Sequence, residues 1–169
     1  MKIYELFNAV CEFKKISKDV CLPENNIRDL LKKLQEAFEI HFSGFEDHEI
    51  KVKIPGYFGN LPNVLYVCIL PEKQIVSNGI YAAVCFDVKG RGALAGCVGS
   101  KKVSQNIKTL TRKSEHSVLK IDVDGASEQT KYNNNFVNPI EFFWPLDKDE
   151  ELILHLQKSL QLAFKLLEN

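Results

Sequence analysis

The chain has 169 residues, which suits one domain with a core of its own. Its apolar fraction of 45% and charged fraction of 26% are ordinary for a globular protein. Its 22 basic residues balance 22 acidic ones, so a chain that is basic throughout is excluded, and any contact with nucleic acid must come from a local patch.

The cysteines predict reduced thiols. There are five of them, an odd number without C-x-x-C spacing, and four lie in apolar surroundings. The sequence also lacks a signal peptide and any apolar run close to the ~20 residues that a membrane span needs. We therefore expect a soluble cytoplasmic domain with no membrane contact. The cysteines are Cys11, Cys21, Cys68, Cys85 and Cys97.

Two amphipathic helices are predicted at the beginning of the chain. Residues 3–17 and residues 24–39 both carry apolar side chains at helical spacing, and Leu22-Pro23 separates them. Charges of alternating sign on the second helix predict that its outer face is solvated. These helices form a helical N-terminal part, residues 1–42.

A sheet follows the helices. Residues 49–54 alternate between apolar side chains and outward-facing Lys51 and Lys53, which is typical of a half-buried strand. Three further strands, Val64–Leu70, Ile80–Val88 and Ala93–Val98, are separated by turn signals that contain Asn-Gly and Gly-Arg-Gly. They predict an antiparallel meander within a sheet core that spans residues 48–144.

The last third of the chain completes the predicted fold. Val118–Val123 reads as a short strand, and Phe136–Trp144 reads as a packed segment whose Phe142, Phe143 and Trp144 belong to the core. Asp147 and Glu150 resemble a capping box before a helix at 149–167, within a C-terminal region of residues 147–168. We predict an α+β domain: one twisted, mainly antiparallel sheet with flanking helices.

One segment departs from the neutral composition. Between Val88 and Ser114 there are seven basic residues and no acidic one. A cationic helix beside an aromatic-rimmed sheet is the footprint expected of phosphate contacts, although a solvated basic helix explains the charge equally well. The basic residues are Lys89, Arg91, Lys101, Lys102, Lys108, Arg112 and Lys113.

Catalytic constellations are weak in this sequence. Glu72, Asp87 and Lys89 have the spacing of a metal-dependent nuclease core, but Glu72 falls in a turn. Cys97 with His116 can be drawn as a nucleophile and base, against the commoner buried strand cysteine. No phosphate-binding loop and no histidine–cysteine metal spacing occur. The sequence therefore predicts no metal, no cofactor and no catalytic residue.

Several motifs together resemble a known family. Phe58-Gly59-Asn60, Leu65-Tyr66 and Ser77-Asn78-Gly79-Ile80-Tyr81 stand in an order that resembles the McrB-like N-terminal domains, the DNA-binding domains of a modified-cytosine restriction family. Asp149-Glu150-Glu151-Leu152, which opens a leucine-rich helix, is also similar to that family. The resemblance covers residues 25–169 and is clearest from Phe58 to Val88.

The resemblance implies a non-catalytic module that binds double-stranded DNA and rotates a modified base, 5-methylcytosine or a similar one, into an aromatic pocket. The implied pocket residues are Tyr66, Tyr81, Cys85 and Tyr132. Base flipping costs a few kcal/mol, which aromatic stacking can offset. The residues expected to contact DNA are Tyr57, Phe58, Asn60, Lys89, Arg91, Lys101, Lys102, Lys108 and Arg112.

The chain departs from the family pattern at two pocket positions. Leu65-Tyr66 stands where the family usually has Pro-Trp, and Cys85 replaces a bulkier aliphatic residue. These changes leave open a pocket for a different modified base, such as hydroxymethylcytosine or methyladenine, or a domain that reads an unmodified sequence in the grooves. The family implies further partners: a nucleotide-hydrolysing motor domain in the same full-length protein and a separate nuclease subunit. Two alternatives stay open, the metal-dependent nuclease and a protein-interaction module that uses the last helix.

Overall fold

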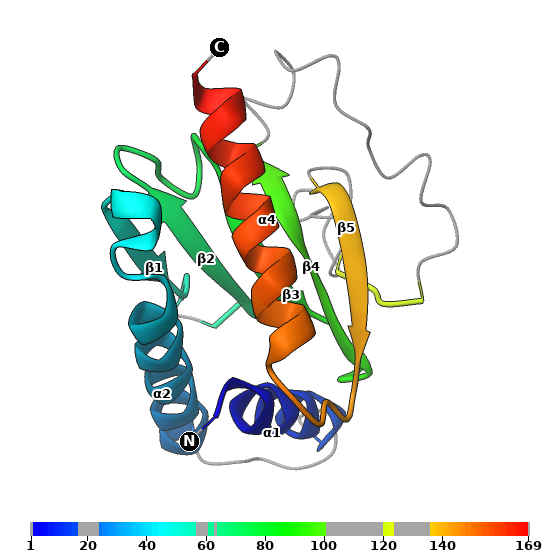
Figure 1. Ribbon diagram of the computed structural model, residues 1–169. Helices are drawn as coiled ribbons and strands as arrows, with labels where there is room; N and C mark the ends of the chain where they lie inside the picture. Colours follow the sequence, from blue (N-terminus) through cyan, green and yellow to red (C-terminus); the bar gives the residue numbers. More distant parts are fainter. Residues whose placement is uncertain are drawn as a thin grey trace.

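The computed structural model describes residues 2–16, 24–56, 61–62, 64–100, 120–123 and 136–168. The described helices are α1 (Ile3–Ile16), α2 (Glu24–Phe42), the short 3-10 helix η1 (Phe45–Asp47) and α4 (Glu150–Leu167). The strands are β1 (Ile50–Lys53), β2 (Tyr66–Pro71), β3 (Ile80–Phe86), β4 (Gly92–Gly99) and β5 (Phe136–Phe143). The fold is the expected α+β arrangement (Figure 1).

The strands form one antiparallel sheet in chain order, β1-β2-β3-β4-β5. The predicted meander is confirmed: Tyr66 pairs with Cys85 between β2 and β3, and Tyr81 pairs with Val98 between β3 and β4. The strand expected at 49–54 is β1, at one edge of the sheet. Every connection within the meander is short, because consecutive antiparallel strands need only a turn between them.

The described α-helices pack on one face of this sheet, which we call the helix face (Figure 1). Its core combines apolar residues of α1, α2 and α4 with every second residue of the strands, among them Val67, Ala82, Val84 and Phe86. In α4 the stripe of Leu152, Leu156 and Leu160 lies fully inside this core. The last helix therefore covers the sheet, and its main apolar stripe is used within the chain.

The opposite face carries a second apolar cluster, and we call it the tyrosine face. Its members are the residues that alternate with those of the helix face, and they include Tyr66, Tyr81 and Cys85. Among the described residues, Ile121 and Val123 add to it from outside the sheet. The helix face is thus built mainly from aliphatic and phenylalanine side chains, and the tyrosine face adds two tyrosines and two cysteines to Phe136 and aliphatic residues.

Strand β5 was not predicted as a strand. Asn138 and Pro139 together stand opposite Gly96, so the register shifts by one residue between Ala95 and Cys97. Pro139 has no N–H to donate to the neighbouring strand. The His155 Nε2 atom of α4 lies 3.0 Å from the Ala95 carbonyl oxygen and donates to it. The bulge is thus tied to α4 as well as to β4.

Three smaller predictions need correction. Of the three aromatic residues predicted to lie in the core, Phe142 is buried and Trp144 is half-buried. Phe143 is 46% exposed, because it follows Phe142 on an edge strand and points to the other side. Residues 120–123 are not a strand. The capping box is wrong because α4 begins at Glu150 with Asp149 as its N-cap, and the Asp149 carboxylate bonds the Tyr4 amide of α1 instead.

Candidate functional site: the tyrosine face

The predicted pocket residues that the structure describes lie on one face. Because residues directly opposite each other in a ladder share a face, the register orders the tyrosine face into rows across the strands. One row runs Lys51–Leu70–Tyr81–Val98. Leu70 stands opposite Tyr81 in this row because these two residues are next to the Ile69–Ala82 pair in the antiparallel register. The next row is Lys53–Cys68–Ala83–Gly96, and the third is Tyr66–Cys85–Leu94–Glu141.

The middle row separates the two tyrosines. Tyr81 stands opposite Leu70, four residues beyond Tyr66 on β2. The Cα atoms of the two tyrosines are therefore about 13 Å apart along the strand direction, at a rise of about 3.3 Å per residue. Between them the face carries only small side chains, those of Cys68 and Ala83, and then Gly96. Two aromatic rings thus flank a strip of small residues.

All three described pocket residues are covered. Tyr66 is 9% exposed, Tyr81 4% and Cys85 1%. The Tyr81 hydroxyl donates a hydrogen bond of 3.0 Å to the Val76 carbonyl, in the turn between β2 and β3. A nucleobase can reach either ring only if covering side chains move aside. The sequence predicted that these residues share a face, and it did not predict that they are buried.

Residues 120–123 lie at one end of the tyrosine face, where two carboxylates hold them. Glu141 of β5 accepts hydrogen bonds from the Lys120 and Ile121 amides at 2.8 and 2.9 Å. Asp87, directly after β3, accepts one from the Asp122 amide at 2.8 Å, and the Val88 amide bonds the Asp122 carbonyl. These bonds fix Ile121 and Val123 in the apolar cluster of the tyrosine face.

Asp87 is the centre of this corner. Its fully buried carboxylate accepts three hydrogen bonds of 2.7 to 2.8 Å from the Arg91 amide and guanidinium. Burial alone would raise the pKa of the Asp87 carboxyl, but the hydrogen bonds from Arg91 and from the Asp122 amide outweigh it and lower that pKa. The predicted DNA contact Arg91 therefore has a structural partner, while Lys89 is exposed on the same turn.

The turn itself is fixed against α1. Gly90 has a φ of +74°, and a Cβ atom there would collide with the Cys11 carbonyl oxygen and the Lys15 side chain. Beside it, the Lys15 ammonium lies over the Trp144 ring, and the Trp144 amide donates to the Arg91 carbonyl at 2.9 Å. The Asp87–Arg91 corner thus links β3, β4 and α1.

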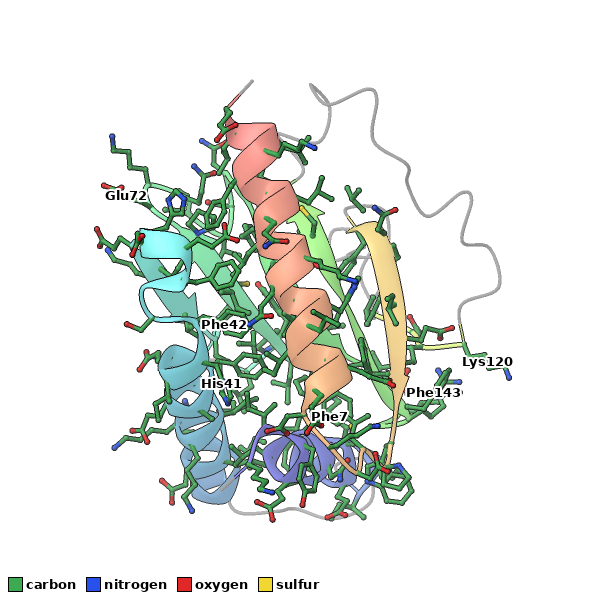
Figure 2. All side chains as sticks on the ribbon, in the orientation of Figure 1. Phe7, His41, Phe42, Glu72, Lys120 and Phe143 are labelled. Carbon is green, nitrogen blue, oxygen red and sulfur yellow. The ribbon has the colours of Figure 1, made fainter. Side chains whose placement is uncertain are left out.

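The nuclease constellation is not assembled. Glu72 follows β2 and Asp87 follows β3, and because these strands are antiparallel, their carboxyl ends lie at opposite ends of the sheet. Figure 2 shows Glu72 at the end away from Phe143, whose partner Gly92 adjoins the Asp87 corner. Within the described part of the chain, no group of three His, Cys, Asp or Glu residues could hold a metal ion.

The thiol nucleophile is not supported either. Cys97 is buried in β4, and burial raises its pKa to about 12, so the thiol stays protonated near neutral pH. Burial likewise raises the pKa of Cys11 to about 12 and raises those of Cys68 and Cys85. These four thiols are free, as expected of a reduced protein, whereas Cys21 and His116 lie outside the described residues.

Part of the predicted site lies outside the described residues. It consists of Tyr57, Phe58, Asn60, Tyr132, Lys101, Lys102, Lys108 and Arg112. For these positions the sequence-based expectations stay predictions.

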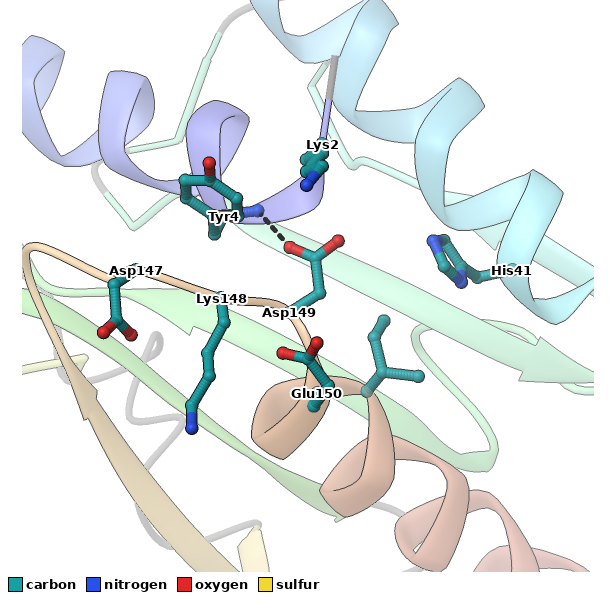
Figure 3. Close-up of a pocket in the computed structure, with 8 residues that line it drawn as sticks. Lys2, Tyr4, His41, Asp147, Lys148, Asp149 and Glu150 are labelled. Carbon is teal, nitrogen blue, oxygen red and sulfur yellow. Dashed lines mark hydrogen bonds between the residues drawn. The ribbon is translucent and has the colours of Figure 1, made fainter.

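A separate cavity of about 410 Å³ lies where ends of the described helices α1, α2 and α4 meet (Figure 3). The Asp149 carboxylate accepts the Tyr4 amide at 2.6 Å, so it caps α1, where the helix dipole favours a negative charge. The cavity is lined by both acidic and basic residues. Its lining is Lys2, Tyr4, His41, Asp147, Lys148, Asp149, Glu150 and Ile153.

Compared with known proteins, the chain matches no family model and no curated sequence. In the part of the chain that is described, no helix is both long and apolar enough to cross a membrane.

Proposed function

We propose that this chain is a DNA-recognition module that binds duplex DNA and takes a modified base, of the 5-methylcytosine type, out of the stack at the tyrosine face. The observation that carries the proposal is the placement of Tyr66, Tyr81 and Cys85 on the sheet face opposite the described helices. In the family that the sequence resembles, the motor and the nuclease lie outside this domain, and we propose the same division of labour here.

The chemistry of this face suits a flat, partly polar ring. Tyrosines offer aromatic surface for stacking together with a hydroxyl, and stacking of a base on an aromatic side chain contributes about 1–3 kcal/mol. Between the tyrosines the face carries the small side chains of Cys68 and Ala83, both of which are buried. The energy needed to extrude a base, a few kcal/mol, is of the same size as the stacking it would gain.

The buried state of the tyrosines sets a condition on this function. Ile121 and Val123 belong to the same cluster, and they are held by hydrogen bonds from backbone amides to two carboxylates rather than by a continuous ladder. A segment of this kind can shift at a lower cost than a strand of the sheet. Base entry thus requires a rearrangement around the tyrosine face.

The test compares a duplex that carries one 5-methylcytosine with the same duplex unmodified, by fluorescence anisotropy. We expect the wild-type chain to bind the modified duplex about fourfold more tightly, because the two bases stack alike and burial of the extra methyl group contributes about 0.8 kcal/mol. Tyr81→Leu should reduce this preference to near unity while weak binding remains. Equal affinity of the wild type for both duplexes would contradict recognition of a modified base.

A matched control separates stacking from stability. Phe86→Leu makes the same kind of change in the same strand, but Phe86 faces α1 on the helix face, 5.3 Å from the Phe7 ring. We expect this variant to be destabilised to a similar degree and to keep its preference for modified DNA. Loss of the preference in both variants would mean that general destabilisation, not the Tyr81 ring, sets the preference.

A further inference from the structure

Two lysines border the tyrosine face at its β1 edge. Lys51 pairs with Leu70, and Lys53 pairs with Cys68. Since Leu70 and Cys68 belong to the tyrosine-face cluster, both lysines project to that face, whereas Val52 between them joins the core of the helix face. Both side chains are exposed. The alternation in the sequence predicted their exposure but could not predict which face of the sheet they occupy.

The lysines lie close to the tyrosines. Lys53 and Tyr66 are diagonal neighbours across β1 and β2, which places their Cα atoms about 7–8 Å apart. Lys51 stands in the same row as Tyr81, with Leu70 between them.

We infer that Lys51 and Lys53 form a phosphate-contact site for DNA at the β1 edge of the tyrosine face. This inference rests on the proposed function and deepens it, because it says where the sugar-phosphate backbone runs when a base lies between the tyrosines. Two cations spaced about 7 Å apart along one strand can each neutralise a phosphate of a polynucleotide. The acidic residue Glu49 directly precedes β1, at the end of the strand that lies near the β2–β3 turn, so the positive charge of this edge is confined to Lys51 and Lys53.

A lysine on an edge strand also has a structural use, since it discourages pairing with another chain. β1 is an edge strand, so this use must be separated from DNA binding by experiment. The distinguishing quantity is the salt dependence of DNA affinity, because each phosphate contact that is lost lowers the slope of log K against log salt by about 0.9. A lysine that only protects the edge leaves that slope unchanged.

The experiment measures affinity by fluorescence anisotropy between about 50 and 200 mM salt, for the wild type and for the double variant Lys51→Gln/Lys53→Gln. We expect the slope to decrease by about 2 and the affinity to drop roughly tenfold or more, equally for modified and plain duplexes. The control is Lys32→Gln/Lys33→Gln, which removes the same charge from exposed positions of α2, in the layer that covers the helix face.

The outcomes separate the two claims. The phosphate site is overturned if the β1 double variant keeps the wild-type slope of log K against log salt. It is also overturned if the α2 control loses as much of that slope as the β1 double variant does. Both outcomes leave the proposed function intact. A wild-type chain that binds no duplex at all contradicts the proposed function itself. Thermal unfolding of both double variants should match the wild type closely, because all four lysines are exposed.

Discussion

The two faces of the same sheet differ in how they are covered. The helix face is sealed by α1, α2 and α4, and its core contains aliphatic side chains and phenylalanines without a polar partner. The tyrosine face combines two tyrosines with small residues, has two lysines at the β1 edge, and is joined at its other end by residues 120–123, which carboxylates hold. The helix face is a closed apolar core, and the tyrosine face carries the residues to which the proposed function assigns base binding.

This difference shows how a single sheet can separate two requirements. Apolar burial is non-directional and tolerates no opening, so the helix face is closed by regular helices. On the tyrosine face, residues 120–123 are held by hydrogen bonds to Asp87 and Glu141, and contacts of this kind open at a lower free-energy cost than a packed helix. Variants placed on each face test this difference.

The largest effect is expected on the helix face. Leu156→Ala removes a fully buried side chain of α4 and should lower the free energy of unfolding by about 3 kcal/mol. Cys85→Ala, equally buried on the tyrosine face, removes one sulfur atom and should cost about 1 kcal/mol. Chemical denaturation measures both. Equal losses would contradict the full burial of Leu156 in the core of the helix face.

An intermediate effect is expected at the corner between the faces. Asp87→Asn keeps the shape of the side chain but replaces a charged acceptor of four hydrogen bonds with a neutral amide. We expect a loss of about 2 kcal/mol, at the low end for a buried ion pair because the Arg91 side chain is 43% exposed and can be solvated. A loss below about 0.5 kcal/mol would mean that the corner is not structural.

The smallest effect is the pH dependence of the same corner. The pKa of Asp87 is lowered in the folded protein, so its ionised form contributes stability above the unfolded value of 3.8, and this contribution is lost as the pH falls through the folded value. The stability difference between wild type and Asp87→Asn should therefore be constant from pH 7 to about 5 and shrink below about pH 4. Denaturation curves at several pH values test this. A stability difference between wild type and Asp87→Asn that grows as the pH falls would contradict a lowered pKa of Asp87 in the folded protein.

The sequence predicted the meander and the helices because their periodicities are local. Val64–Leu70 and Ile80–Val88 carry their own turn signals, and α4 carries a full apolar stripe. Strand β5 escaped prediction because the two-residue bulge at Asn138-Pro139 breaks the alternation on which strand prediction depends.

The site was predictable in part. Tyr81 and Cys85 share a face because they lie four residues apart in one strand, which the sequence alone indicates. The position of Tyr66 relative to them depends on the register between two strands. The burial of all three depends on residues distant in the sequence, such as Ile121. The Asp87–Arg91 pair was missed because the sequence indicated Asp87 as a candidate metal ligand and Arg91 as a DNA contact, and only the fold buries the aspartate beside the arginine.

The most direct test of the central claim, that the tyrosine face receives an extruded base, is the emission of 2-aminopurine placed beside a single 5-methylcytosine in a duplex. This probe brightens when its neighbour leaves the stack. At saturating wild-type protein we expect a clear rise in emission, and a much smaller one with the unmodified duplex. Binding of the modified duplex with no change in emission would contradict extrusion of the base.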